Sequence, residues 1–123
     1  MTRDVDAARL RGLMGLCVRA RQAAFGEDGC LKLVRSGGCG ALLVDEAASQ
    51  ATREKYRGAC AHAGVPLLLL PEGLLHEATG RPGMAMAVAR GGLAGQIVNL
   101  IPGVKRDNQP MKSANNGGGA SVE

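Results

Sequence analysis

Two short apolar runs without polar interruption constrain the fold of this chain more than any other feature. Residues 41–44 (Ala-Leu-Leu-Val) lie between Gly40 and Asp45, and residues 65–70 are Val-Pro-Leu-Leu-Leu-Leu. A run that lacks alternation is typical of a strand buried on both faces, as in a parallel sheet covered by helices. Pro66 is compatible with the second strand because no ladder donor is needed at a strand's start. The two runs therefore predict the centre of a sheet with helices on each side.

Helical patterns flank these runs along the chain. A first helix is predicted over residues 4–21, capped by Asp4 or Asp6, because apolar residues recur there at helical spacing (Leu10, Leu13, Met14 and Cys17). Further helices are predicted at residues 30–36, between the cap Ser49 and the closing Gly64, and at residues 74–79 and 92–100. Short strands are predicted at residues 22–25 and 84–89. This order predicts an α/β fold, a three-layer α/β/α sandwich with a small mixed central sheet.

One domain accounts for most of the 123 residues, which are enough for one core and too few for two. We expect it to span residues 1–101. Residues 102–123 contain little to bury, and we expect them to form a flexible, disordered C-terminal tail. The tail carries Lys105, Arg106 and Lys112, which could touch phosphates, although a solvated tail is the commoner case.

Charge and aromatic content narrow the classes of partner. The net charge is +4 and the sequence pI is near 9.2, values that permit contact with nucleic acid without requiring it. The chain has one Phe, one Tyr and no Trp, so it lacks the aromatic platforms on which single-stranded bases stack. A nucleic-acid partner would therefore be recognised by its shape and its phosphates.

The four cysteines form no C-x-x-C pair, and His62 and His76 are not at ligand spacing from them. We therefore expect no metal and no cofactor, and we expect reduced, buried thiols in a reducing compartment. No leader-like segment opens the sequence, and no apolar run approaches the roughly 20 residues of a membrane span. These features predict a cytoplasmic protein that makes no contact with a membrane.

Catalytic groups do not converge in the sequence. Ser49 has no histidine near it, and Glu77 is the one carboxylate beside His76. Asp45 and Glu46 end a predicted strand, a position at which doubly wound enzymes place catalytic groups. A small hydrolase or nucleotide-binding protein would need a polar pocket there. We expect no catalytic residues and no enzyme activity.

Three stretches together resemble a known family. They are residues 25–37, residues 42–55, and the ordered set of residues 64–66, Leu75, Gly80 and residues 81–89. Their order and spacing are similar to those of the kink-turn-RNA-binding ribosomal protein superfamily of the L-seven-Ae type, and in particular to its short bacterial YlxQ-like members. The resemblance covers about residues 10–97.

This resemblance implies a non-catalytic, ribosome-associated monomer that binds structured RNA, ribosomal or kink-turn-like. It implies two contact segments. The first is the strand-to-helix junction, with Gly26, Glu27, Asp28, Gly29 and Lys32; the second is the loop before the last strand, with Arg81, Gly83 and Met84. A helix N-terminus offers unpaired N–H groups and positive potential to a phosphate, which agrees with the first segment.

Two positions depart from the family pattern. Strong kink-turn binders carry an Asn-Glu pair where this chain has Asp28 and Gly29. Asp28 lacks the amide donor and adds a negative charge, and Gly29 has no side chain, so we expect weaker binding or a different specificity. The acidic segment can equally be a helix start that satisfies the helix dipole. The alternative function is a protein–protein interaction module that has the fold without kink-turn affinity.

Overall fold

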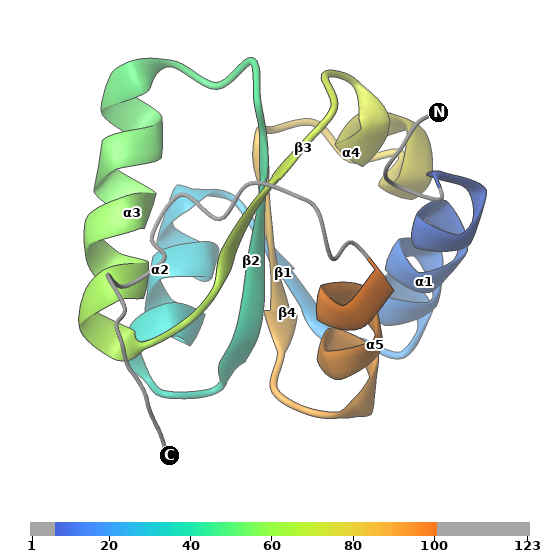
Figure 1. Ribbon diagram of the computed structural model, residues 1–123, viewed down its shortest axis with the longest axis horizontal. Helices are drawn as coiled ribbons and strands as arrows, with labels where there is room; N and C mark the ends of the chain where they lie inside the picture. Colours follow the sequence, from blue (N-terminus) through green and yellow to red (C-terminus); the bar gives the residue numbers. More distant parts are fainter. Residues whose placement is uncertain (1–6, 101–123) are drawn as a thin grey trace.

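A four-stranded sheet lies between two layers of helices in the computed structural model, which describes residues 7–100. The elements are α1 (Ala7–Arg19), β1 (Ala23–Phe25), α2 (Glu27–Arg35), β2 (Cys39–Asp45), α3 (Gln50–Ala63), β3 (Leu67–Leu70), α4 (Leu74–Thr79), β4 (Ala85–Ala89) and α5 (Gly92–Leu100). Figure 1 shows α2 and α3 on one side of the sheet and α1, α4 and α5 on the other. The predicted three-layer α/β/α sandwich is confirmed. The predicted caps Asp4 and Asp6 and the tail at residues 102–123 lie outside the described residues.

The sheet is mixed, as predicted, with strand order β1-β4-β2-β3. β2 and β3 are parallel, with Leu42 opposite Leu67, whereas β4 runs antiparallel to both β1 and β2. Phe25 at the end of β1 lies opposite Met86 of β4. This pairing brings the start of β4 to the same end of the sheet as the start of α2.

Successive residues of the central strands contact opposite helical layers. On β2, Leu42 and Val44 pack with α2 and α3, while Leu43 packs with α1, α4 and α5. All three side chains have no exposed surface. Both faces are apolar, which explains why the run lacks the alternation of a half-exposed strand.

β2 contains a β-bulge at Gly40 and begins earlier than predicted. Cys39 lies opposite Ala89 and Ala41 opposite Val88, so the register shifts between them. A Cβ on Gly40 would lie 2.7 Å from the Cβ of Ala94, because α5 packs directly on this backbone. The strand therefore begins at Cys39, whereas the prediction treated Gly40 as its boundary.

Two predicted helix boundaries were wrong. α2 begins at Glu27 instead of residue 30, because Gly26 has the non-helical φ of 80° and ψ of 156° that place it at the N-cap. α1 ends at Arg19 instead of residue 21, because Arg21 adopts a left-handed φ of 59°. Gln22 N–H donates to the Cys17 carbonyl at 2.8 Å in the manner of a Schellman motif. The strands β3 and β4 begin at Leu67 and Ala85, two and one residues later than predicted.

The remaining helix predictions are confirmed in detail. Ser49 caps α3 by accepting a hydrogen bond from Thr52 N–H at 3.1 Å, and Gly64 ends the helix in the left-handed conformation. α4 and α5 span the residues predicted for them. The four cysteines are buried free thiols. No helix within residues 7–100 has the length and apolar character needed to cross a membrane.

Candidate RNA-binding site

The junction between β1 and α2 is held open by the backbone of Gly26. Its φ of 80° and ψ of 156° belong to a region that essentially glycine alone occupies. No side chain caps the helix at this residue, and the first helical bond is donated by Cys30 N–H to the Gly26 carbonyl at 2.9 Å. The amides that precede Cys30 in the first turn have no intrahelical acceptors, and they face the place where an anion can bind.

The loop between α4 and β4 is shaped by two glycines and by a short hydrogen-bond network. Gly80 and Gly83 have φ angles of 70° and 111°. Arg81 N–H donates to Thr79 Oγ1 at 3.1 Å, and the Arg81 carbonyl lies 3.2 Å from His76 Nδ1. Residues 80–84 are exposed, and the Met84 side chain retains 45% of its accessible surface. An apolar side chain this exposed is available to contact a partner.

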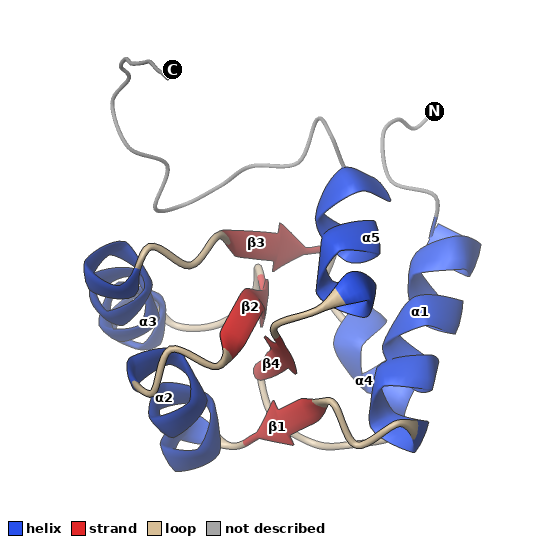
Figure 2. Cartoon of the chain, turned by 90° about the horizontal axis from the view of Figure 1, so that it is seen from below, coloured by secondary structure: helices blue, strands red, loops and turns tan. Residues whose placement is uncertain are grey.

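A cation–π contact joins the loop to the junction. The Arg81 guanidinium lies 4.8 Å from the centroid of the Phe25 ring, at the last residue of β1. In Figure 2 the connection from α4 to β4 runs beside β1, close to where β1 passes into α2. The two segments predicted from the sequence therefore lie beside each other. We call them together the junction surface; it consists of Gly26, Glu27, Asp28, Gly29, Lys32, Arg81, Gly83 and Met84.

The acidic residues of the junction surface have different surroundings. Glu27 Oε2 accepts a hydrogen bond from Lys55 Nζ of α3 at 2.7 Å, and both side chains are about half exposed. This ion pair offsets the charge of Glu27. Asp28 is exposed and pairs with no other described residue. Asp28 is therefore the uncompensated negative charge at the start of α2.

Gly29 and Lys32 complete the first segment. A Cβ on Gly29 would lie 3.8 Å from the Cβ of Ala24, an ordinary contact distance, so the position has room for a side chain. Lys32 lies one turn further along α2, is exposed, and forms no ion pair with another described residue. Its ammonium group is free to contact a phosphate near the helix start.

Asp45 organises the loops behind the junction surface, a role that the sequence reasoning did not assign to it. The residue as a whole is 95% buried, and its carboxylate accepts hydrogen bonds from Ala47 N–H at 2.7 Å and Gly73 N–H at 3.0 Å. Its backbone N–H donates to the Met84 carbonyl at 2.8 Å. One residue thus ties the loops after β2 and β3 to the loop before β4. An Asp directly after an apolar strand is the sequence feature that could have indicated such a turn.

Side chains considered for catalysis have structural partners. The Ser49 hydroxyl caps α3 and donates to Thr52 Oγ1 at 3.0 Å. Glu77 pairs with Arg11 of α1 at 3.0 Å. Within residues 7–100, no three His, Cys, Asp or Glu side chains are arranged to hold a metal ion.

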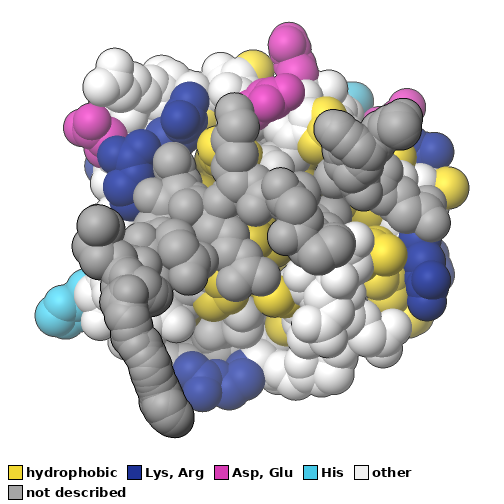
Figure 3. All heavy atoms as spheres, viewed as in Figure 1, with side chains coloured by type: hydrophobic (Ala, Val, Ile, Leu, Met, Phe, Trp, Pro, Cys, Tyr) yellow, Lys and Arg dark blue, Asp and Glu magenta, His cyan; other side chains and the backbone are white. Residues whose placement is uncertain are grey.

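Positive charge is spread over the molecule. On the face shown in Figure 3, Lys and Arg side chains lie at separate places, over α3, over α1 and near the lower edge of the view. The junction surface itself contributes the cations Lys32 and Arg81. Contact with an anionic partner there therefore depends on a few charges and on backbone amides.

Comparison with solved structures places this chain among proteins of one fold. It is similar to a protein of unknown function from Bacillus halodurans, with 26% identity, a TM-score of 0.73, and coverage of 77% of this chain and 98% of that one. It is also similar to a 15.5kD RNA-binding protein from Giardia lamblia, with 17% identity, a TM-score of 0.65, and coverage of 78% and 87%.

Larger proteins contain the same fold as one part. An archaeal translation termination factor matches at 17% identity with a TM-score of 0.53, over 70% of this chain and 26% of its own length. The Pelota protein of Thermoplasma acidophilum matches at 10% identity with a TM-score of 0.55, over 68% and 28%. No protein-family model and no curated protein matches the sequence. The chain thus shares its fold with the Giardia protein and with parts of the archaeal termination factor and of Pelota, which is consistent with the L-seven-Ae-type fold that the resemblance predicted.

Proposed function

We propose that this chain is a non-catalytic RNA-binding protein that holds structured RNA against the junction surface. The observation that carries the proposal is the contact between Arg81 and Phe25, which joins an uncapped helix N-terminus to an exposed loop. Phosphates would bind the amides of the first turn of α2 and Lys32, while the Met84 loop would cover adjacent nucleotides. The likeness to the Giardia RNA-binding protein supports this assignment.

The proposal extends to the kind of RNA and to the place in the cell where it is bound. We propose a ribosomal or kink-turn-like RNA, bound by a cytoplasmic monomer that associates with the ribosome, as in the bacterial YlxQ-like proteins that the sequence resembles. Asp28 and Gly29 replace the Asn-Glu pair with which strong kink-turn binders of that family read purine bases. The affinity of this chain would therefore depend on phosphate contacts. Such contacts release counterions, and binding should weaken steeply as salt rises.

Charge reversal at Lys32 tests this function. In a mobility-shift assay with a kink-turn hairpin and with ribosomal RNA, Lys32→Glu should weaken binding about tenfold or more, which corresponds to about 1.4 kcal/mol. Lys32→Ala should reduce the slope of log affinity against log salt by about one unit. The matched control is Arg90→Glu, an equal charge change at the opposite end of β4. Absence of binding at low salt, or equal losses in both reversals, would contradict the proposal.

A protein-binding alternative is favoured by one observation at the same surface. Met84 is an exposed apolar side chain beside the acidic start of α2, an arrangement that suits a protein partner as well as RNA. A pull-down that returns the same proteins before and after nuclease treatment, from a chain that binds no RNA in the shift assay, would support this alternative.

A further inference from the structure

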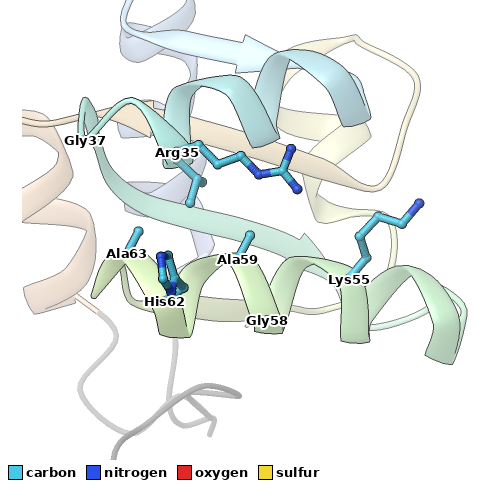
Figure 4. A pocket seen from close by; sticks show the side chains of 8 residues that line it. Arg35, Gly37, Lys55, Gly58, Ala59, His62 and Ala63 are labelled. Atoms are coloured by element: carbon cyan, nitrogen blue, oxygen red, sulfur yellow. The ribbon is translucent and has the colours of Figure 1, made fainter.

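A groove lies between α2 and α3, outside the junction surface. Its volume is about 660 Å³, within the range of ordinary ligand sites, and Figure 4 shows its lining: Val34, Arg35, Gly37, Lys55, Gly58, Ala59, His62 and Ala63. None of these residues belongs to the junction surface. We call this hollow the α2–α3 groove.

The lining combines an apolar floor with a cationic rim. Val34 is fully buried, and Ala59 and Ala63 are half-buried at the base. Arg35 extends from α2, and Lys55 and His62 stand on α3 (Figure 4). No carboxylate belongs to the lining. A ligand that fits this groove has an apolar group for the floor and negative charges for the rim.

Gly58 keeps the groove open near the middle of α3. It is exposed, and a Cβ built on it would meet no atom within 4 Å. Packing within the protein therefore does not require a glycine here. A glycine in a helix interior is less favourable for the helix than alanine. Because Gly58 lines the groove, any larger side chain at this position would partly fill it.

We propose that the α2–α3 groove binds an acidic peptide segment that inserts one bulky apolar side chain. Carboxylates on either side of that side chain would pair with Arg35, whose planar guanidinium suits bidentate carboxylate contacts, and with Lys55. Lys55 is already paired with Glu27 in a half-exposed ion pair, and such pairs exchange partners readily.

An RNA ligand fits the groove less well. The lining contains no Phe, Tyr or Trp, so His62 is its one ring on which a base could stack. A phosphate bound by Arg35 needs neither an apolar floor nor a hollow. The α2–α3 groove is therefore a second site, separate from the junction surface, and its assignment does not depend on RNA binding at that surface.

The test uses the full chain and a fluorescein-labelled probe peptide, Glu-Asp-Glu-Glu-Phe-Glu-Asp-Glu-Glu, followed by anisotropy. We expect saturable binding that weakens about tenfold or more when the peptide's Phe is replaced by Ala. Arg35→Glu and Gly58→Leu should each cause a comparable loss. Gly58→Leu also controls for folding, since it replaces a helix-interior glycine with a better helix former whose Cβ meets no atom within 4 Å. Lys32→Glu, on the same helix but outside the groove, should change peptide affinity less than about threefold.

Three outcomes would overturn the assignment. The first is no binding of the probe peptide at low salt. The second is equal binding of the Phe and Ala peptides, or binding that Gly58→Leu leaves unchanged. The third is displacement of the peptide by a ten-nucleotide single-stranded RNA whose own binding Gly58→Leu weakens, because the groove would then hold nucleic acid. Failure of RNA to bind the junction surface would appear in the mobility-shift assay, which does not involve the probe peptide.

Discussion

Position 26 requires a glycine because of its backbone conformation, and not because neighbouring atoms exclude a side chain. A Cβ there would meet no atom within 4 Å, yet φ is 80° and ψ is 156°. We expect Gly26→Ala to lower the free energy of unfolding by about 1–3 kcal/mol in urea denaturation. Gly12→Ala is the matched control, because Gly12 is also free of contacts but lies inside α1, where alanine should stabilise by up to about 1 kcal/mol. Equal effects of the two substitutions would contradict the conformational argument.

If the junction surface binds RNA as proposed, Asp28 and Gly29 should limit how well it distinguishes one RNA from another. Gly29 has room for a side chain, since the nearest atom to its Cβ would be that of Ala24 at 3.8 Å. The double variant Asp28→Asn/Gly29→Glu supplies the pair found in strong kink-turn binders and removes the charge of Asp28. We expect it to bind a kink-turn hairpin about tenfold more tightly than the native chain. The double variant and the native chain should bind a hairpin without the kink with equal affinity, which would show that the gain reflects recognition of the kink. An equal gain for both hairpins would contradict this.

The buried carboxylate of Asp45 should contribute strongly to stability. Replacing it by Ala leaves Ala47 N–H and Gly73 N–H without their charged acceptor at partly buried hydrogen bonds. We expect a loss of about 2–3 kcal/mol in the free energy of unfolding, measured in urea. Glu46→Ala, at the neighbouring exposed position, should change it by less than about 0.5 kcal/mol. A small effect of Asp45→Ala would mean that the three loops hold their positions without it.

At the scale of elements, most of the sandwich was predictable because its signals are local. The cap at Ser49, the closing glycine at position 64 and the bounds of α4 depend on neighbouring residues, and the sequence contains those residues. Gly40 misled the prediction because α5 packs on it through Ala94, which is 54 positions away in the chain. The start of α2 was placed late because two glycines around two acidic residues are typical of a loop, and the dihedral angles of Gly26 decide otherwise.

The candidate site was predictable in parts but not as a surface. Each segment could be named from the resemblance, yet the contact between Arg81 and Phe25 joins residues 56 positions apart. The ion pair between Glu27 and Lys55 and the hydrogen bonds of Asp45 are likewise long-range. The α2–α3 groove was missed because it arises from the packing of two helices.

The buried thiols in the layer formed by α2 and α3 should make the free energy of unfolding fall as the pH rises in the alkaline range. Burial raises the pKa of Cys30 to about 11 and that of Cys60 to about 12, from the ordinary value of 9.0. A thiol with a raised pKa in the folded state stabilises fully below its unfolded pKa, and this contribution is lost as pH rises toward the folded value. Between pH 9.0 and about 11, each such thiol should lower the free energy of unfolding by up to about 1.4 kcal/mol per pH unit.

Urea denaturation at a series of pH values measures this dependence. Cys60→Ala should make the alkaline decline shallower, whatever it does to stability at neutral pH. A decline of the same slope in the native chain and in this variant would show that other groups cause it.

At the scale of the whole molecule, α2 contributes residues to both candidate sites. Its N-terminus belongs to the junction surface, and its last turn, with Arg35, forms the rim of the α2–α3 groove. Lys55 connects the two regions, since it lines the groove and pairs with Glu27. The sandwich thus places a candidate RNA site and a candidate peptide site on one helical layer.

The most direct test of RNA binding at the junction surface is an NMR titration of the ¹⁵N-labelled chain with a kink-turn hairpin. We expect the largest amide shift changes at residues 26–32 and at Arg81, Gly83 and Met84, with small changes at Ala59 and His62 in the groove and at Arg90 beyond β4. Changes concentrated in the groove or on α1, or a spectrum that the RNA leaves unaltered, would contradict the assignment of the junction surface as the RNA-binding site.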